Sequence, residues 1–215
     1  MSASVAPTEI VNLTLDLIKT ENINDITIPD DDKISAVCAR WWDDTRQECQ
    51  EGFPWVFSST RAAIPLNATA PDFGFTDAYV LPNGYLSLNF INYQHIPLSQ
   101  WNYTIEDGNI HIDNGKAERL NIGYVFDQTD VSKWSPSFKF FVAASFGEKV
   151  AYKLTGNAGL QKRMSEAKQR EQINAQAKNG KVNPPIAYRQ SRMLNARRIF
   201  GGAARSPLGR PHGRA

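Results

Sequence analysis

Three groups of neighbouring carboxylates are the residues of this sequence whose types and spacing could support catalysis. They are Asp30-Asp31-Asp32, Asp43-Asp44 and Glu106-Asp107. Two carboxylates that flank a sugar can act as general acid and as base or nucleophile in glycoside hydrolysis. Each group also has a structural explanation, as a helix cap, a helix surface and a turn respectively. We therefore expect that the protein is not an enzyme, with a carboxylate cell-wall hydrolase as one alternative.

The cysteines and histidines indicate no metal or nucleophile site. His95, His111 and His212 share no metal-ligand spacing with each other or with the cysteines, and no phosphate loop or nucleophile elbow occurs. Cys38 and Cys49 fall on one predicted helix, where a rise of about 1.5 Å per residue separates them by about 16 Å. A disulfide needs Cα atoms within about 7 Å, so the sequence predicts two buried free thiols, no metal and no cofactor.

The charged residues are distributed unevenly along the 215 residues. Residues 1–155 contain 11 Lys/Arg and 20 Asp/Glu, whereas residues 156–215 contain 13 Lys/Arg and 2 Asp/Glu. From Lys181 to the last residue there is no acidic side chain. An acidic body followed by a basic segment predicts a partner with a negative surface, either protein or nucleic acid. Because no apolar run approaches the roughly 18 residues of a membrane span and the start does not resemble a signal peptide, we expect a soluble protein made in the cytoplasm.

The basic segment, residues 179–215, is expected to be an extended tail that becomes ordered on binding. Large apolar side chains alternate with arginines in it, and such desolvated anchors favour a groove on a protein. Binding to nucleic acid is the alternative, because the eight Lys/Arg of residues 181–215 could contact phosphates. The predicted binding residues are Tyr188, Arg189, Arg192, Met193, Leu194, Arg197, Arg198, Ile199 and Phe200.

Apolar periodicity predicts four helices on the two sides of a β-region. The helices are expected at residues 8–20, from Asp30-Asp31-Asp32 to about Glu51, from Pro136 to Thr155, and at roughly 158–178. The last of these is so polar that it needs a narrow contact stripe or a partner. The aromatic run Phe53-Pro54-Trp55-Val56-Phe57 is too apolar to stay exposed, and we place it in the core where the helices meet the β-region.

Between the second and third helices, turn signals separate short strand-like runs. The runs are residues 85–90, 103–105, 110–112 and 120–126, and Asp107-Gly108-Asn109 is the clearest hairpin turn. We expect a small antiparallel sheet. The predicted fold class is α+β: a mainly α-helical bundle (residues 1–60 and 134–178) with a small antiparallel β-domain inserted (61–133) and an extended basic C-terminal tail (179–215).

Five short motifs follow one another in this chain. They are Phe53-Pro54-Trp55-Val56-Phe57-Ser58, Arg61-Ala62, Ala78-Tyr79-Val80-Leu81-Pro82, Phe141-Val142-Ala143-Ala144-Ser145-Phe146-Gly147-Glu148-Lys149-Val150-Ala151, and Leu154-Thr155-Gly156. Their order, together with that of the predicted helices and strands, resembles the tail tubular protein A family, the head-to-tail adaptors of short-tailed bacteriophages. The resemblance covers residues 8 to about 178. Where family members often carry Asp shortly after Leu-Pro, this chain has Asn83-Gly84.

This resemblance implies a structural protein of the virion, a head-tail connector without a chemical step. It implies a homo-oligomeric ring of about twelve subunits under the portal protein. Such a ring closes the packaged head and carries the tail nozzle, a tail tubular protein B-like protein, while genomic DNA passes through its channel during ejection. In similar adaptors the C-terminal extension reaches the portal, which agrees with a basic arm that docks into acidic grooves.

Overall fold

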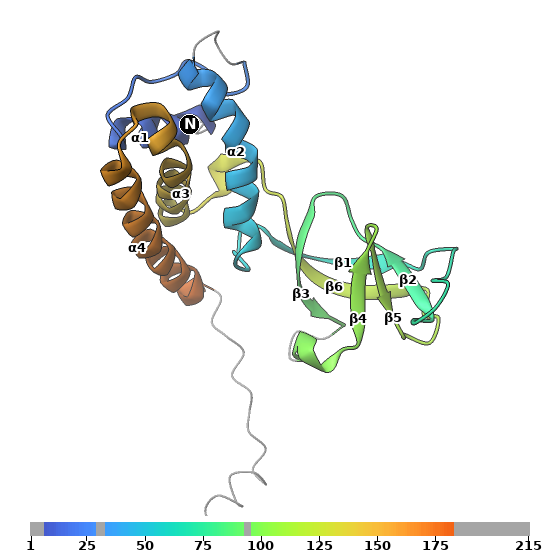
Figure 1. Ribbon diagram of the computed structural model, residues 1–215. Helices are drawn as coiled ribbons and strands as arrows, with labels where there is room; N and C mark the ends of the chain where they lie inside the picture. Colours follow the sequence, from blue (N-terminus) through green and yellow to red (C-terminus); the bar gives the residue numbers. More distant parts are fainter. Residues whose placement is uncertain (1–6, 29–32, 93–95, 183–215) are drawn as a thin grey trace, which may run out of the picture. The chain divides into compact units, whose positions relative to one another are not determined.

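A computed structural model describes residues 7–28, 33–92 and 96–182 of the chain (Figure 1). Within them, four α-helices flank two three-stranded antiparallel sheets, which confirms the predicted α+β class. In chain order the elements are α1 (Pro7–Leu17), α2 (Lys33–Glu51), β1 (Ser59–Pro65), β2 (Asp77–Val80), β3 (Tyr85–Ile91), η1 (Leu98–Gln100), β4 (Tyr103–Glu106), β5 (Asn109–Ile112), β6 (Arg119–Phe126), η2 (Val131–Lys133), α3 (Pro136–Thr155) and α4 (Ala158–Val182).

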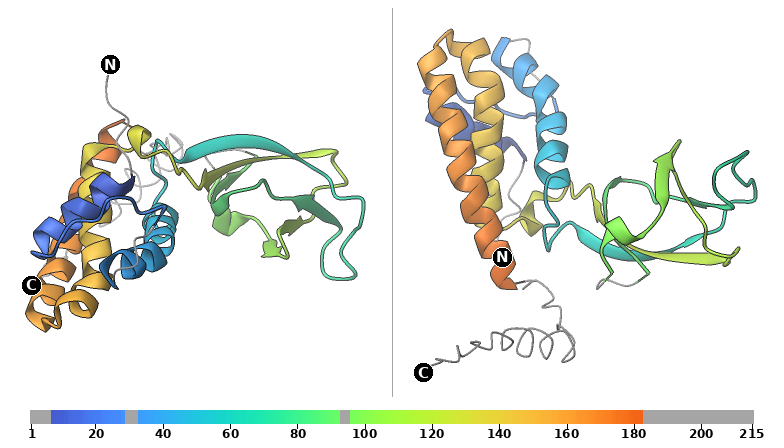
Figure 2. Two further views of the ribbon diagram at one scale, coloured as in Figure 1. Left: turned by 90° about the horizontal axis from the view of Figure 1, so that it is seen from above. Right: turned by 60° about the horizontal axis from the view of Figure 1, so that its bottom comes forward.

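Helix α3 is the centre of the helical bundle. It contacts α1, α2 and α4, and α4 lies alongside it with α2 on its other side (Figures 1 and 2). Its start and end agree with the sequence prediction because both are determined locally. The hydroxyl of Ser135 accepts from the backbone N of Phe138 at 3.3 Å, Pro136 occupies the first turn, and Gly156 ends the helix with a φ of 67°.

Gly147 allows α3 to approach its neighbours closely. A Cβ at this position would lie 2.4 Å from Cε of Met164 on α4 and 3.2 Å from Cγ2 of Thr14 on α1. The Met164 atom is the end of a flexible side chain and can shift. Thr14 is buried and its hydroxyl donates to the carbonyl of Ala143 on α3 at 3.0 Å, so a side chain larger than a methyl group at residue 147 has little room.

Replacement of Gly147 by leucine is expected to lower the free energy of unfolding by about 1–3 kcal/mol, because it overpacks this contact. Urea unfolding followed by circular dichroism measures the change. The matched control is Gly180→Leu on α4, where no atom lies within 4 Å of the added Cβ. An equal effect of both substitutions would contradict a packing constraint at Gly147.

The two sheets enclose a second hydrophobic cluster, separate from that of the helices. One sheet has the strand order β1-β6-β3 and the other β2-β5-β4, and an isolated bridge between Leu66 and Tyr79 joins them. The predicted hairpin is confirmed: Asp107 and Gly108 connect β4 to β5 with φ values of 45° and 70°. The buried residues between the sheets are Ile64, Tyr79, Ile91, Ile110, Ile112, Leu120, Ile122 and Tyr124.

Two strands were not expected from the sequence, and they divide the predicted sheet into two. Strand β1 contains Arg61 and ends at Pro65, so it lacks a continuous alternation of apolar and polar residues. Strand β2 has four residues, of which the first three are buried, so it shows no period of two either. Pairing with β6 and β5, which lie far away in the chain, gives both segments their strand conformation.

Candidate interaction surfaces

The predicted binding residues of the basic segment lie outside the described residues. All nine fall within residues 183–215, so the structure does not test their grouping: Tyr188, Arg189, Arg192, Met193, Leu194, Arg197, Arg198, Ile199 and Phe200. The described part of the chain does contain the point where this segment begins. It is the end of α4, which extends to Val182 and therefore beyond the predicted end near Lys178.

A side-chain contact of Asn179 explains why α4 continues beyond the predicted end near residue 178. Its Oδ1 accepts from the backbone N of Val56 at 3.0 Å, and its Nδ2 donates to the carbonyl of Pro54 at 3.4 Å. Such paired contacts let an amide side chain satisfy backbone groups that would otherwise need water. The last turn of α4 is thereby held against the turn between α2 and β1.

That turn is the aromatic run predicted to lie in the core. Trp55 is fully buried, its Nε1 donates to the carbonyl of Cys49 at 2.9 Å, and its ring centroid lies 4.8 Å from that of Phe138. Pro54 and Val56 depart from the prediction because both are exposed, Val56 to 42%, while Phe53 and Phe57 are partly buried. Tertiary contacts thus bury one residue of the run and leave its neighbour on the surface.

A hollow of about 450 Å³ lies beside Val56, and we call it the basal groove. Three segments line it: residues 56–57 of the aromatic turn, residues 133–137 at the start of α3, and the end of α4. Val182, the last described residue, is 72% exposed at its edge. Apolar lining is provided by Val56, Phe57, Pro136 and Val182, and positive charge by Lys133 and Lys178.

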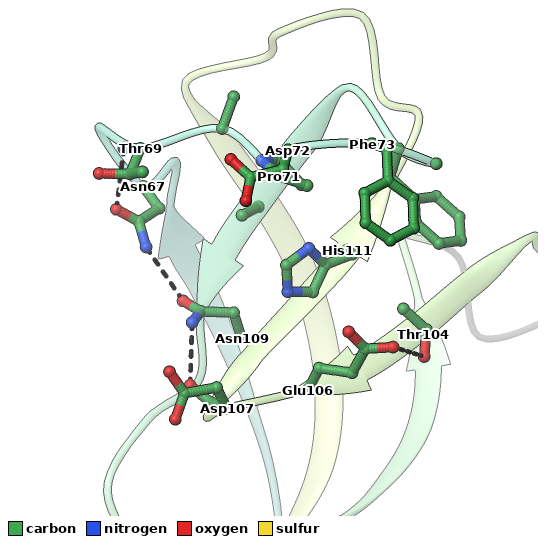
Figure 3. A pocket seen from close by; sticks show the side chains of 14 residues that line it. Asn67, Thr69, Pro71, Asp72, Phe73, Thr104, Glu106, Asp107, Asn109 and His111 are labelled. Atoms are coloured by element: carbon green, nitrogen blue, oxygen red, sulfur yellow. Dashed lines mark hydrogen bonds between the residues drawn. The ribbon is translucent and has the colours of Figure 1, made fainter.

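A second hollow, of about 630 Å³, lies on the face of the sheet β2-β5-β4 that is turned away from the other sheet (Figure 3). The register places Ala78, His111 and Thr104 in one row across the three strands. Figure 3 shows the His111 ring in the middle, with Asp72 and Phe73 of the loop after β1 on one side and Glu106 on the other. The Phe73 side chain is 88% exposed, which is unusual for so large an apolar group.

The sequence contains a pattern that indicates two of the residues lining this second hollow. Residues 109–112 read Asn-Ile-His-Ile, and this alternation places Asn109 and His111 on the face opposite Ile110 and Ile112. The contribution of Asp72 and Phe73 had no such signal, because it depends on the unexpected strand β2 and on the path of the loop before it.

The candidate catalytic carboxylates that the structure describes belong to separate elements, α2 and the β4-β5 hairpin. Asp43 forms an ion pair with Arg46 at 3.1 Å, and Asp44 is exposed on α2. Glu106 accepts a hydrogen bond from the Thr104 hydroxyl at 3.2 Å and Asp107 belongs to the hairpin turn, while Asp30, Asp31 and Asp32 lie outside the described residues. In the described ranges, no group of three or more His, Cys, Asp or Glu residues could hold a metal ion.

No protein-family model matches this chain, and no curated protein matches it significantly. Among the helices that the structure describes, none combines the length and the apolar character needed to cross a membrane.

Both cysteines lie on α2, are buried and form no disulfide, as the sequence predicted. Burial raises the pKa of the Cys49 thiol to about 11. A thiol in such an environment stays protonated at neutral pH, which makes it a packing residue and a poor nucleophile.

Glu48 is exposed on α2, and its side chain also forms ion pairs with the two neighbouring helices. It pairs with Lys149 of α3 and with Lys168 of α4, the latter at 3.6 Å, and Lys168 also reaches Glu148 at 2.9 Å. The hydrogen bond from Lys149 lowers the pKa of Glu48 below its usual value of 4.5, and the positive charges of both lysines act in the same direction. The positions of α3 and α4 beside α2 decide this pairing, so the sequence of α2 alone could not predict it.

A carboxylate with a lowered pKa in the folded state adds stability above its unfolded pKa and loses it as the pH falls through the folded pKa. The free energy of unfolding is therefore expected to decrease as the pH falls below 4.5, the usual pKa of this group. Glu48→Gln is expected to make that decrease smaller, as measured by urea unfolding between neutral pH and pH values below 4.5. Glu51→Gln, an exposed change on the same helix, is the control and should leave the pH dependence as in the wild type.

Proposed function

We propose that this protein is the subunit of a structural adaptor ring that joins the portal of a short-tailed bacteriophage to the tail nozzle. In this role it closes the packaged head and forms part of the channel for DNA. The observation that carries the proposal is the order of the family-like motifs along the elements. Phe53-Pro54-Trp55-Val56-Phe57-Ser58 joins α2 to β1, Ala78-Tyr79-Val80-Leu81-Pro82 covers β2, and the Ala-rich motif from Phe141 to Ala151 lies within α3.

These motifs supply residues that build the fold, which makes a chance resemblance harder to explain. Trp55 and Tyr79 are fully buried, and the Tyr79 hydroxyl donates to the carbonyl of Ala117 at 2.8 Å. Gly147 provides the close contact between α3, α4 and α1. A resemblance carried by such packing residues supports a shared architecture more than a shared chemistry.

Several large apolar side chains are exposed on the described part of the chain, and a ring would give them partners. Burial of such groups between neighbouring subunits is the ordinary driving force of association. Repeated contacts of one kind around an axis close into a ring. The most exposed are Phe73, Ile28, Val182, Ile173, Tyr152 and Phe140.

The test is the mass of the complex formed with a purified portal ring, with the chain at full length and truncated after Val182. This position preserves α4 and the Asn179 contact, so we expect a folded truncated monomer by circular dichroism and sedimentation. The full-length chain should add a fixed large mass to the portal ring, and the truncated chain should add none. The absence of any added mass with the full-length chain would refute the adaptor proposal.

The second candidate function is nucleic-acid binding, which the eight Lys/Arg without acidic residues after residue 180 favour. A titration of duplex DNA at several salt concentrations distinguishes it. Binding through phosphates would weaken with a slope of log K against log salt of about −0.9 per phosphate contact, and it would disappear in the truncated chain. For the adaptor proposal we expect weak DNA binding at physiological salt alongside portal binding.

A further inference from the structure

Three asparagines in the described part of the chain are followed directly by glycine: Asn83-Gly84, Asn114-Gly115 and Asn179-Gly180. In such a pair the backbone N of the glycine can attack the side-chain carbonyl carbon of the asparagine, because glycine has no side chain to obstruct the approach. The reaction requires an asparagine side chain that can rotate toward the glycine and a glycine N–H that no other group holds. The three pairs differ in both requirements.

The pair on α4 meets neither requirement. The Asn179 side chain accepts from the backbone N of Val56 at 3.0 Å and donates to the carbonyl of Pro54 at 3.4 Å. Gly180 lies inside α4, where each backbone N–H donates to the carbonyl four residues earlier. This pair can react only when the end of the helix opens, which lowers its rate.

The pair after β5 has a side chain that is held in place. Nδ2 of Asn114 donates to the hydroxyl of Tyr79 at 3.2 Å, and its backbone N donates to Oδ2 of the buried Asp77 at 2.9 Å. Tyr79 is itself fully buried, and its hydroxyl donates to the carbonyl of Ala117 at 2.8 Å. Rotation of the Asn114 side chain therefore requires the loss of a hydrogen bond to a fixed partner.

The pair between β2 and β3 meets both requirements. Asn83 and Gly84 are exposed at the centre of a turn that is closed by a hydrogen bond from the backbone N of Tyr85 to the carbonyl of Pro82 at 3.2 Å. Gly84 has a φ of 74°, as glycine does at the third residue of a type II turn. Within the described ranges, neither the Asn83 side chain nor the backbone N of Gly84 has a hydrogen-bond partner.

We propose that Asn83 is a site of spontaneous deamidation and that the fold protects Asn114 and Asn179 from the same reaction. The backbone N of Gly84 bonds to Cγ of Asn83, the bond from Cγ to Nδ2 breaks, and the Gly84 proton leaves with Nδ2 as ammonia. Water then adds to one of the two carbonyls of the cyclic imide, which opens to aspartate or isoaspartate with one new carboxylate. The inference does not depend on the adaptor role.

The modified turn lies beside the ion pair between Asp127 and Arg46. The backbone N of Asp127 donates to the carbonyl of Gly84 at 2.7 Å, and a Cβ on Gly84 would lie 3.9 Å from Cβ of Asp127. Isoaspartate at residue 83 lengthens the main chain of the turn by one carbon atom, so this hydrogen bond loses its geometry. The modified protein is therefore expected to unfold at a lower urea concentration than the unmodified protein.

Incubation of the full-length protein at mildly alkaline pH, followed by mass spectrometry of its peptides, tests the proposal. The peptide with Asn83 is expected to convert at least about tenfold faster than those with Asn114 or Asn179, because these must first lose a buried or helical contact. Asn83→Gln should abolish the conversion at this position and the accompanying decrease in the urea midpoint. Tyr79→Phe, which removes the hydroxyl that holds Asn114, should accelerate the conversion of Asn114 and leave that of Asn83 unchanged.

The matched control is the same chain unfolded in guanidinium chloride, where the three pairs should convert at similar rates because all lose their contacts. Conversion of Asn114 or Asn179 in the folded protein as fast as that of Asn83 would overturn the proposal. So would an Asn83 that stays an amide in the folded chain, or rates that keep the same order after unfolding, since neighbouring residues would then decide them. The readout is covalent and separate from the portal assay, so failure of one proposal leaves the other standing.

Discussion

Asp127→Ala is expected to lower the free energy of unfolding by about 3 kcal/mol, the lower end of the range for breaking a buried ion pair. Asp127 pairs with Arg46 of α2, whose side chain is 6% exposed, and also accepts from Gln47 at 3.1 Å. Without Asp127, the ion-pair partner that remains for the buried guanidinium among the described residues is Asp43, at 3.1 Å, whose side chain is 73% exposed. The measurement is urea unfolding at neutral pH.

The control for this prediction is Asp43→Ala, which removes the exposed partner of the same arginine. It should change the free energy of unfolding by about 1 kcal/mol or less, as expected for a surface ion pair. The double variant Arg46→Met with Asp127→Leu should regain much of the loss, since apolar residues of similar volume can replace a buried pair. Equal effects of Asp43→Ala and Asp127→Ala would show that burial does not determine the strength of this pair.

Beside this ion pair, hydrogen bonds between Gln50 and Gln128 connect helix α2 to the segment that follows strand β6. Nε2 of Gln50 donates to the carbonyl of Gln128 at 3.1 Å, and the backbone N of Gln128 donates to Oε1 of Gln50 at 2.8 Å. Nε1 of Trp134 donates to the same carbonyl at 3.1 Å. These buried contacts fix the segment after β6 to α2 before the chain enters α3.

Trp55→Ala is expected to cost about 3–5 kcal/mol, the usual range for removing a large buried aromatic side chain. Its ring lies in an aromatic cluster, with centroid distances of 4.9 Å to Phe53 and 4.8 Å to Phe138, and its Nε1 donates to Cys49. Trp55→Phe keeps much of the ring and loses the hydrogen bond, so about 1–2 kcal/mol is expected. Unfolding in urea, monitored by circular dichroism because a tryptophan is removed, measures both.

Val56→Ala, next in the chain, is the control and should change the free energy of unfolding by about 0.5 kcal/mol or less, because its side chain is half exposed. If Trp55→Ala does not fold, Trp55→Phe still tests the prediction in a folded protein. An effect of Trp55→Phe no larger than that of Val56→Ala would contradict a central role for this residue in the core.

Local signals in the sequence determined the parts of this fold whose causes are themselves local. Ser135, Pro136 and Gly156 define α3 because a cap, a first-turn proline and a left-handed glycine act within one turn of the helix. Asp107 and Gly108 define the β4-β5 hairpin because a two-residue turn requires positive φ at both positions. The same locality made the absence of a disulfide between Cys38 and Cys49 predictable from their spacing on one helix.

Only the tertiary structure decided the features that depend on residues distant in the chain. Strands β1 and β2 form because β6 and β5 pair with them, and Glu48 is an interhelical partner because Lys149 and Lys168 lie beside it. Asn179 continues α4 because its Nδ2 donates to the carbonyl of Pro54 and its Oδ1 accepts from the backbone N of Val56. The basal groove exists only where three segments distant in the chain meet. The sequence indicated the basic C-terminal segment as the candidate binding part. The surface at which this segment begins depends on the packing of α4 against the aromatic turn. No local pattern encodes that packing, because it joins residues more than 120 positions apart.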